Sequence, residues 1–148
     1  MNRIFDSKPG YGIIHISILL LRIGCASMML THGIPKLMHL ISGEEIKFGD
    51  PIGLGTNLSF ILATFAEAIC SLFILVGLVT RLSSIPLIIN MSVITFVVWA
   101  HDPFSRKELS LFYLISFILL FLTGGGKYSF DGLIERKTHL RKVKFPAA

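Results

Sequence analysis

The chain has 148 residues, of which 53% are hydrophobic and 16% are charged, and its formal net charge is +5. A soluble domain of this size needs more charged residues to cover its surface, so the composition excludes an ordinary soluble globular protein. We therefore expect the chain to lie in lipid, with its positive charge serving as a membrane-surface anchor and not as a nucleic-acid-binding surface.

Four apolar stretches follow one another along the chain. They cover residues 13–32, 57–77, 82–100 and 109–123, and the last is the shortest. A transmembrane helix needs about 20 residues to cross about 30 Å of hydrocarbon. Four such spans leave no room for a second folded domain. We therefore expect residues 1–148 to form one all-α integral membrane bundle of four transmembrane helices, ending in a basic tail at residues 127–148.

A charged residue interrupts each of the first two stretches, Arg22 in the first and Glu67 in the second. A charge at the centre of a membrane helix costs roughly 2.5–3.5 kcal/mol on insertion scales. Because opposite charges on neighbouring helices offset that cost, we expect Arg22 and Glu67 to form an interhelical pair. The pair could be a brace that fixes the helix register, or it could take part in chemistry or binding, and the sequence leaves both roles open.

Position along each stretch can be converted into depth, because a helix rises ~1.5 Å per residue. If both termini lie on one side of the membrane, one polar residue in each stretch falls roughly 12–15 Å from that side. These residues are Arg22, Glu67, Asn90 and Tyr113. We therefore expect a polar layer near the middle of the membrane.

A second polar set lies near the opposite ends of the stretches. Its members are His32, Lys36, His101 and Glu108. We expect them to converge beneath the loop of residues 42–57 as a candidate ligand-binding cluster, because histidine exchanges protons near neutral pH and lysine favours an anionic oxygen. Alternatively, they are interfacial residues at solvated helix ends. The five histidines do not suggest a metal site.

Lysine and arginine near the helix ends indicate the orientation, since the cytoplasmic side of a membrane protein is enriched in them. Nine of them fall on the side of the two termini and of the turn at Arg81, and four fall on the other side. We therefore expect a multi-pass protein of the inner (cytoplasmic) membrane with both termini in the cytoplasm. The basic tail can also rest on anionic lipid.

Several short elements, taken together, resemble those of the DoxX-like membrane proteins. They are Arg22, His32-Gly33-Ile34-Pro35-Lys36, Glu67, Gly77-Leu78-Val79-Thr80-Arg81, His101, Glu108 and Gly124-Gly125-Gly126-Lys127-Tyr128-Ser129-Phe130-Asp131. The resemblance covers about residues 13–134 and rests on the order and spacing of the elements. One departure is Gly125, where the last element of that family often carries proline or alanine. The resemblance implies a four-helix membrane bundle.

The same resemblance implies two functional hypotheses. Relatives include a membrane subunit associated with thiosulfate:quinone oxidoreduction and members linked to membrane redox-stress complexes. In the first hypothesis the chain is a quinone-linked redox subunit, in which His32, Lys36 or His101 hydrogen-bonds the quinone. In the second it is a non-catalytic anchor or scaffold in a larger complex. A small-molecule carrier is disfavoured because the sequence shows no internal repeat and no broken helices.

The sequence contains no motif for a bound redox cofactor. It has no C-x-x-C, no P-loop and no dinucleotide-binding fingerprint. We therefore expect no covalent cofactor, and under the quinone hypothesis the electrons come from a partner or directly from a substrate. The expected partners are membrane lipid and either other subunits or further copies of the chain, and whether the protein is itself an enzyme stays open.

Overall fold

The computed structural model describes the backbone of residues 10–144 and the side chains of residues 10–137. All regular structure in this range is helical, as predicted, and it contains no strand. The elements are α1 (Tyr11–Ser42), α2 (Thr56–Thr64), the π-helical η1 (Phe65–Cys70), α3 (Ser71–Val76), α4 (Thr80–Val93), the π-helical η2 (Ile94–Val98), α5 (Phe104–Thr123) and α6 (Phe130–Lys144). Arg3 and Lys8, which belong to the orientation argument, and tail residues 145–148 lie outside the described residues.

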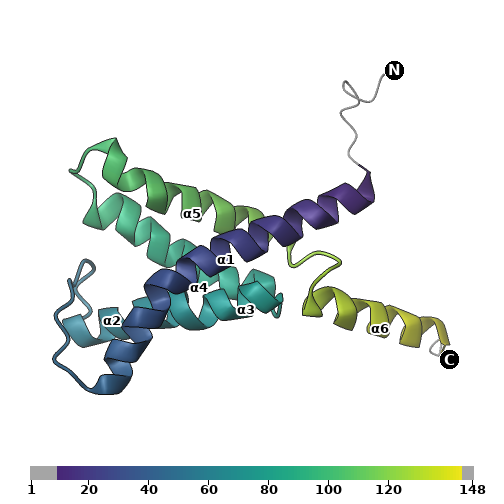
Figure 1. Cartoon of the computed structure of the whole chain (residues 1–148), viewed down its shortest axis with the longest axis horizontal. Helices are drawn as coiled ribbons and strands as arrows, with labels where there is room; N and C mark the ends of the chain where they lie inside the picture. The colour runs from purple at the N-terminus through teal and green to yellow at the C-terminus, as the bar shows by residue number, and fades with distance from the viewer. Residues whose placement is uncertain (1–9, 145–148) are drawn as a thin grey trace.

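The elements α2, η1 and α3 run on without a break, and so do α4 and η2. Together with α1 and α5, these two continuous segments form the bundle. Figure 1 shows α5 lying alongside α4, α1 crossing the bundle, and α6 extending away from its end. The bundle therefore has four helical segments, with the C-terminal helix outside it.

Three segments of the described chain are long and apolar enough to cross a membrane, namely Tyr11–Ser42, Thr56–Val76 and Thr80–Val98. The fourth, α5, has 20 residues, but its opening turns carry Arg106, Lys107 and Glu108. Its uninterrupted apolar stretch is therefore shorter than those of the others. The prediction of four spans is thus supported for three helices of the described chain.

The first helix is longer than its predicted span. That span ends at residue 32, whereas α1 continues through Pro35 to Ser42 and stops at Gly43, which has a left-handed φ of 70°. Proline removes one amide donor and kinks a helix that continues past it, and Figure 1 shows α1 turning over its C-terminal third. At ~1.5 Å per residue the helix is about 48 Å long, which exceeds the hydrocarbon thickness.

The turn between α3 and α4 is set by Gly77, whose φ of 77° is left-handed. The amide of Leu78 donates to the carbonyl of Phe73, and the amide of Gly77 donates to the carbonyl of Ile74. This is the Schellman pattern, which ends a helix by satisfying its last carbonyls. The turn brings α3 and α4 back alongside each other.

The core of the bundle is formed by buried apolar residues of all four segments: Cys25, Ala26, Met29, Ala66, Cys70, Ile74, Leu87, Met91, Tyr113, Leu114, Phe117 and Leu120. Small residues among them let α1 and η1 approach closely, as is common between membrane helices. By contrast, the outward-facing side chains of α5 are apolar and exposed, as at Phe112 and Leu122. The bundle thus has an apolar surface as well as an apolar core.

Candidate functional site

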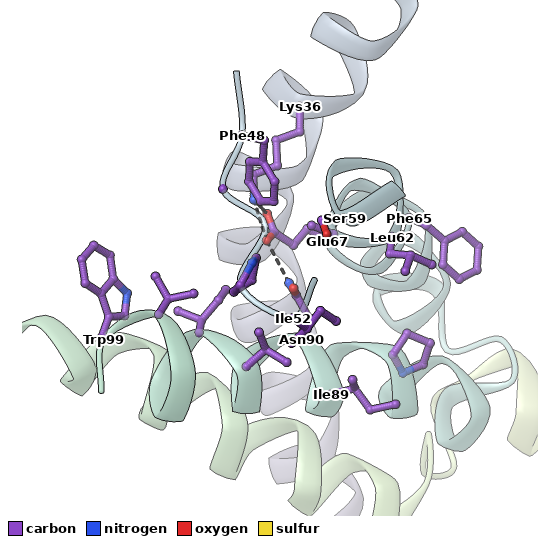
Figure 2. A pocket seen from close by; sticks show the side chains of 17 residues that line it. Lys36, Phe48, Ile52, Ser59, Leu62, Phe65, Glu67, Ile89, Asn90 and Trp99 are labelled. Carbon is purple, nitrogen blue, oxygen red and sulfur yellow. Dashed lines mark hydrogen bonds and ion pairs between the residues drawn. The ribbon is translucent and has the colours of Figure 1, made fainter. Parts of the chain in front are cut away.

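Glu67 is a buried carboxylate held by two partners from other helices. Its side chain is 2% exposed. The ammonium of Lys36 lies 2.6 Å from both carboxylate oxygens, and the amide nitrogen of Asn90 donates to one of them at 2.9 Å. Figure 2 shows the three side chains converging from α1, η1 and α4. An ion pair completed by a further hydrogen bond is the arrangement that makes a carboxylate tolerable in so apolar a setting.

The contact between Lys36 and Glu67 depends on Gly33, which lies one turn earlier on α1. A Cβ on Gly33 would lie 2.4 Å from the carbonyl carbon and oxygen of Glu67. A side chain there would therefore push α1 away from η1. Because residues three positions apart share a helix face, the close approach at Gly33 places Lys36 within reach of the Glu67 side chain.

Glu67 also lies inside a π-helical segment, since η1 covers Phe65–Cys70. A π-turn adds a residue to a helical turn and is found frequently at functional sites. A second π-helical segment, η2, directly precedes Trp99. Both π-helical segments line one cavity beside Glu67. Their shared position is a second reason to treat this region as the candidate site.

A cavity of about 530 Å³ lies against the Glu67 carboxylate, beneath the loop that joins α1 to α2. Lys36, Glu67 and Asn90 form its polar end, and Figure 2 shows their three side chains close together. Its other walls are largely apolar and include Phe48, Ile52, Phe65, Ile89, Val93 and Trp99. Volumes of this order are typical of small-molecule sites. The cavity lies where the sequence predicted a site, beneath the loop of residues 42–57.

The loop over the cavity is ordered by Asp50. Its carboxylate accepts hydrogen bonds from the amides of Leu54 and Gly55 at 2.9 and 2.7 Å, and from the hydroxyl of Ser59 at 2.9 Å. These bonds, that of Gly55 above all, lower the pKa of the Asp50 carboxyl below its usual value. The carboxylate therefore stays ionised at neutral pH and fastens the loop to the beginning of α2.

Phe48, in the same loop, lies over the polar end of the cavity. Its ring centroid is 5.5 Å from the Lys36 ammonium and 5.3 Å from the ring centroid of Phe60. A cation near the face of an aromatic ring is attracted by the ring's quadrupole. The loop thus contributes directly to the environment of Lys36.

Arg22 lies at the other end of the bundle, where it holds the segment between α5 and α6. Its side chain is 3% exposed. One terminal nitrogen donates to the carbonyl of Gly125 and the other to the carbonyl of Tyr128, both at 2.8 Å. The Gly77 turn packs directly on the guanidinium, since a Cβ on Gly77 would lie 2.2 Å from Nη1.

Asp131 fastens the same segment to the α3–α4 turn. Its carboxylate accepts from the amides of Val79 and Thr80 at 2.7 and 2.8 Å, and its own amide donates to the carbonyl of Gly77 at 2.9 Å. The first amides of a helix have no partner within the helix, and a carboxylate satisfies them. We call Arg22, Gly77, Gly125 and Asp131 the Arg22 clamp, and its contacts are those of a structural fastening.

The predicted ion pair between Arg22 and Glu67 is therefore wrong. The expected register places residue 13 of the first helix level with Gly77, whereas Gly77 packs on Arg22 and Gly33 packs on Glu67. The first helix is thus displaced along its axis by more than two turns relative to the expected register. The prediction of a single polar layer is therefore wrong for Arg22, although Glu67 and Asn90 are in contact.

A family model described as DoxX matches residues 17–101, which is more than half of the chain. The protein belongs to the DoxX family. No curated protein and no solved structure matches the chain. Together with its three apolar helices, the family membership makes this DoxX protein a multi-pass membrane protein in contact with lipid.

The matched part of this DoxX protein contains both polar centres found in the bundle. Lys36, Glu67 and Asn90 lie within it, and so does Arg22. The segment of residues 124–131, which completes the Arg22 clamp, lies beyond the match. The candidate site therefore lies wholly within the part of the chain that shows the family.

The four residues expected to converge at the outer ends do not form one cluster in this DoxX protein. Lys36 pairs with Glu67 instead. His101 and Glu108 are exposed, and no hydrogen bond or ion pair within residues 10–137 joins them to Lys36 or to each other. Both lie where helices end in solvent, so water can satisfy them. This placement agrees with the alternative that they are interfacial residues.

His32 and Tyr113 contact each other without lining the cavity. Their ring centroids are 6.4 Å apart at an interplanar angle of 87°, with His32 exposed and Tyr113 3% exposed. Tyr113 also stacks on Phe117, with centroids 6.1 Å apart. The structure of this DoxX protein therefore gives Tyr113 a place in the packed core.

The sequence did not indicate the aromatic walls of the cavity, Phe48, Phe65 and Trp99. Each comes from a different element, so no periodicity in the sequence connects them. One usable signal was Trp99, the single tryptophan of the chain, which lies near the end of an apolar stretch as aromatic residues do at membrane interfaces. Another was the apolar pair Ile89 and Val93, which lie on the same side of α4 as Asn90.

Proposed function

We propose that this protein is an inner-membrane subunit of a redox complex and that it binds a lipid-soluble quinone in the cavity beneath the α1–α2 loop. The observation that carries the proposal is the Lys36–Glu67 pair in the lining of a largely apolar cavity. A purely structural pair needs only packed side chains around it. A pair that borders an open space can also hold the polar end of a ligand.

The chemistry of the lining suits a quinone, which has carbonyl oxygens on an apolar ring. The Lys36 ammonium has three N–H groups, of which two are directed at the oxygens of Glu67, so one is left to donate to a carbonyl. Phe48 and Trp99 offer ring faces and edges against which a quinone ring can pack. The volume of about 530 Å³ is within the range of small-molecule sites.

Some side chains that line the cavity also lie on the outer surface of the bundle, and they support a route from lipid into the cavity. Leu62, Phe65 and Ile89 line the cavity, and they are also 47%, 47% and 58% exposed. On a membrane protein such apolar exposed side chains face hydrocarbon. A ligand dissolved in the bilayer could therefore enter between η1 and α4, with its tail remaining in lipid.

The proposed topology makes α5 the fourth span, with both termini in the cytoplasm. Phe112, Ile115 and Leu122 are exposed apolar residues of α5 and suit contact with lipid. The charged opening turns of α5 would then lie at the outer membrane surface, where charges are tolerated. The basic helix α6 would lie on the cytoplasmic side, in agreement with the positive-inside rule.

In this proposal the electrons are supplied by a partner subunit or by a substrate, because the sequence lacks a cofactor-binding motif. The residues of this chain bind and orient the quinone. Lys36 donates to its oxygen, Glu67 holds Lys36 in place, and the apolar walls exclude water from around the ring.

A second candidate function is that of a non-catalytic membrane scaffold. It is favoured by the Arg22 clamp, which fastens the segment before α6 to α1 and to the α3–α4 turn. The clamp holds the segment directly before α6, and Figure 1 shows α6 extending away from the bundle. In this case a partner would bind α6, and Lys36 and Glu67 would form a brace between helices.

Purification in mild detergent, followed by analysis of the extracted lipids and by titration with decylubiquinone, tests the first candidate. We expect a quinone to copurify and decylubiquinone to bind, and we expect Glu67→Gln to weaken binding. Glu45→Gln is the matched control, since Glu45 is 83% exposed and does not line this cavity. If the intact wild-type protein carries no quinone and binds no decylubiquinone, the quinone proposal is rejected and the scaffold remains.

A further inference from the structure

The orientation of the Asn90 amide follows from its neighbour. The Glu67 carboxylate, which is paired with the Lys36 ammonium, can only accept hydrogen bonds. Asn90 must therefore present its amide nitrogen to Glu67, as it does at 2.9 Å. Oxygen and nitrogen of an amide are otherwise hard to distinguish, but here the partner decides. The amide oxygen consequently faces away from the carboxylate.

The amide oxygen of Asn90 is open to the cavity. This oxygen has no hydrogen-bond partner among the described residues. It is also absent from the fully buried side-chain atoms of those residues that lack a partner, so part of its surface is accessible. Asn90 itself lines the cavity. The oxygen is therefore an acceptor that a ligand can reach.

Lys36 supplies a donor at the same carboxylate. Two of its three N–H groups are directed at Glu67, to which Asn90 is also bound. Its side chain is 26% exposed and borders the cavity, with the ring of Phe48 nearby. The polar end of the cavity therefore offers one donor and one acceptor, both anchored on the same carboxylate.

From this pairing we propose that the cavity selects a ligand whose aromatic head group carries a hydroxyl. A hydroxyl oxygen accepts from Lys36 while its hydrogen is donated to the amide oxygen of Asn90. A carbonyl or ether oxygen also accepts from Lys36, but it places a second acceptor against Asn90. For the quinone class this means that the hydroquinone binds more tightly than the quinone, a statement that rests on the proposed function. The preference for a hydroxyl applies to any aromatic alcohol.

The test compares two ligands of nearly equal shape, 4-decylphenol and 4-decylanisole, which differ in having O–H or O–CH₃ at one position. Binding to the purified full-length protein in mild detergent is followed by tryptophan fluorescence. The readout is local, because Trp99 is the single tryptophan and lines the cavity. We expect the phenol to bind roughly tenfold more tightly, the value of about one good hydrogen bond. Equal affinities in the wild-type protein would overturn the proposal.

Two variants assign the preference to its residue. Asn90→Leu keeps the size of the side chain and removes the acceptor, so the phenol should lose its advantage over the anisole. Asn57→Leu is the matched control, because Asn57 is exposed and does not line the cavity, and it should retain the advantage. A preference that survives in folded Asn90→Leu contradicts the role of Asn90. If Asn90→Leu does not fold, the ligand comparison in the wild-type protein decides.

A parallel titration with decylubiquinone and decylubiquinol separates this inference from the proposed function. Tighter binding of the phenol and of the quinol supports both. If the phenol is preferred but neither quinone form binds, the hydroxyl preference stands and the quinone function is rejected. If the quinone binds at least as tightly as the quinol and the two decyl ligands bind equally, the quinone function stands and the hydroxyl preference is rejected. If none of the four ligands binds, both are rejected.

Discussion

The ammonium of Lys36 lies 2.6 Å from both carboxylate oxygens of Glu67, although the two residues are 31 positions apart in the chain. The contact joins α1 to η1 beside the cavity and places a charged pair where an apolar core would otherwise continue. Glu67 is almost fully buried and Lys36 is partly exposed to the cavity. The relationship therefore connects the stability of the bundle with the chemistry of the site.

A double-mutant cycle on Lys36→Met and Glu67→Gln measures this contact. Removing one partner of a buried pair leaves the other charge uncompensated, so we expect each single variant to be destabilised and the two to be coupled by about 1–3 kcal/mol. The measurement is chemical denaturation in detergent. The same cycle on Lys47→Met and Glu45→Gln, an exposed pair at 3.8 Å, should give a coupling close to zero. Equal coupling in the two cycles would contradict a buried role for Lys36 and Glu67.

Gly33→Ala should destabilise the bundle by about 1–3 kcal/mol, the usual cost of overpacking. The added Cβ would lie 2.4 Å from the Glu67 backbone, so α1 and η1 would have to separate. Gly24→Ala, on the same helix with nothing within 4 Å of the added atom, should be neutral or stabilising, because alanine favours a helix over glycine. Thermal unfolding of the two variants compares them directly. A Gly33→Ala protein as stable as Gly24→Ala would show that the close approach is absent.

The sequence predicted the class of this fold well and its helix register badly. Hydropathy located the apolar segments because burial in lipid demands long apolar runs, whatever the contacts between them. The relative displacement of two helices depends on which side chains interlock, and the glycines Gly33 and Gly77 decide it here. Counting depth within each helix could not reveal that Arg22 faces Gly77 while Glu67 faces Gly33.

Asp131→Ala should lower stability by about 1 kcal/mol, as the loss of a capping carboxylate does elsewhere. It leaves the amides of Val79 and Thr80 without their partner, so their hydrogen exchange should become faster. Exchange measured by mass spectrometry on the peptide that spans the α3–α4 turn is the check. Glu135→Ala, an exposed carboxylate on α6, should leave that peptide unchanged. Unchanged exchange in Asp131→Ala would mean that the Arg22 clamp does not hold the beginning of α4.

The loop over the cavity should loosen in acid. Its hydrogen bonds to Leu54 and Gly55 lower the pKa of Asp50, so the folded protein has the lower pKa and the unfolded chain the usual one near ~3.9. The contribution of Asp50 to loop order is therefore complete above the unfolded pKa and is lost as the pH falls through the folded pKa. A carboxyl titration by NMR should place its midpoint below that of an unfolded peptide. A midpoint at or above the peptide value would contradict the loop geometry.

The candidate site was predicted in part. Its place beneath the loop of residues 42–57 could be inferred because Lys36 and other polar residues lie near that end of the helices. The composition of the site could not, since His101 and Glu108 were expected there and Phe48 and Trp99 were not. Side chains from a loop and from irregular π-helical segments carry no periodic signal, so only the folded chain shows that they meet.

The central claim is that a lipid-soluble quinone binds in the cavity bordered by Lys36 and Glu67. Photolabelling of the purified protein with an azidoquinone, followed by peptide mass spectrometry, tests it most directly. We expect labels within residues 48–52, 62–67 or 86–99, and we expect excess decylubiquinone to prevent this labelling. Labels confined to the outer face of α5, or labelling that decylubiquinone does not reduce, would contradict it.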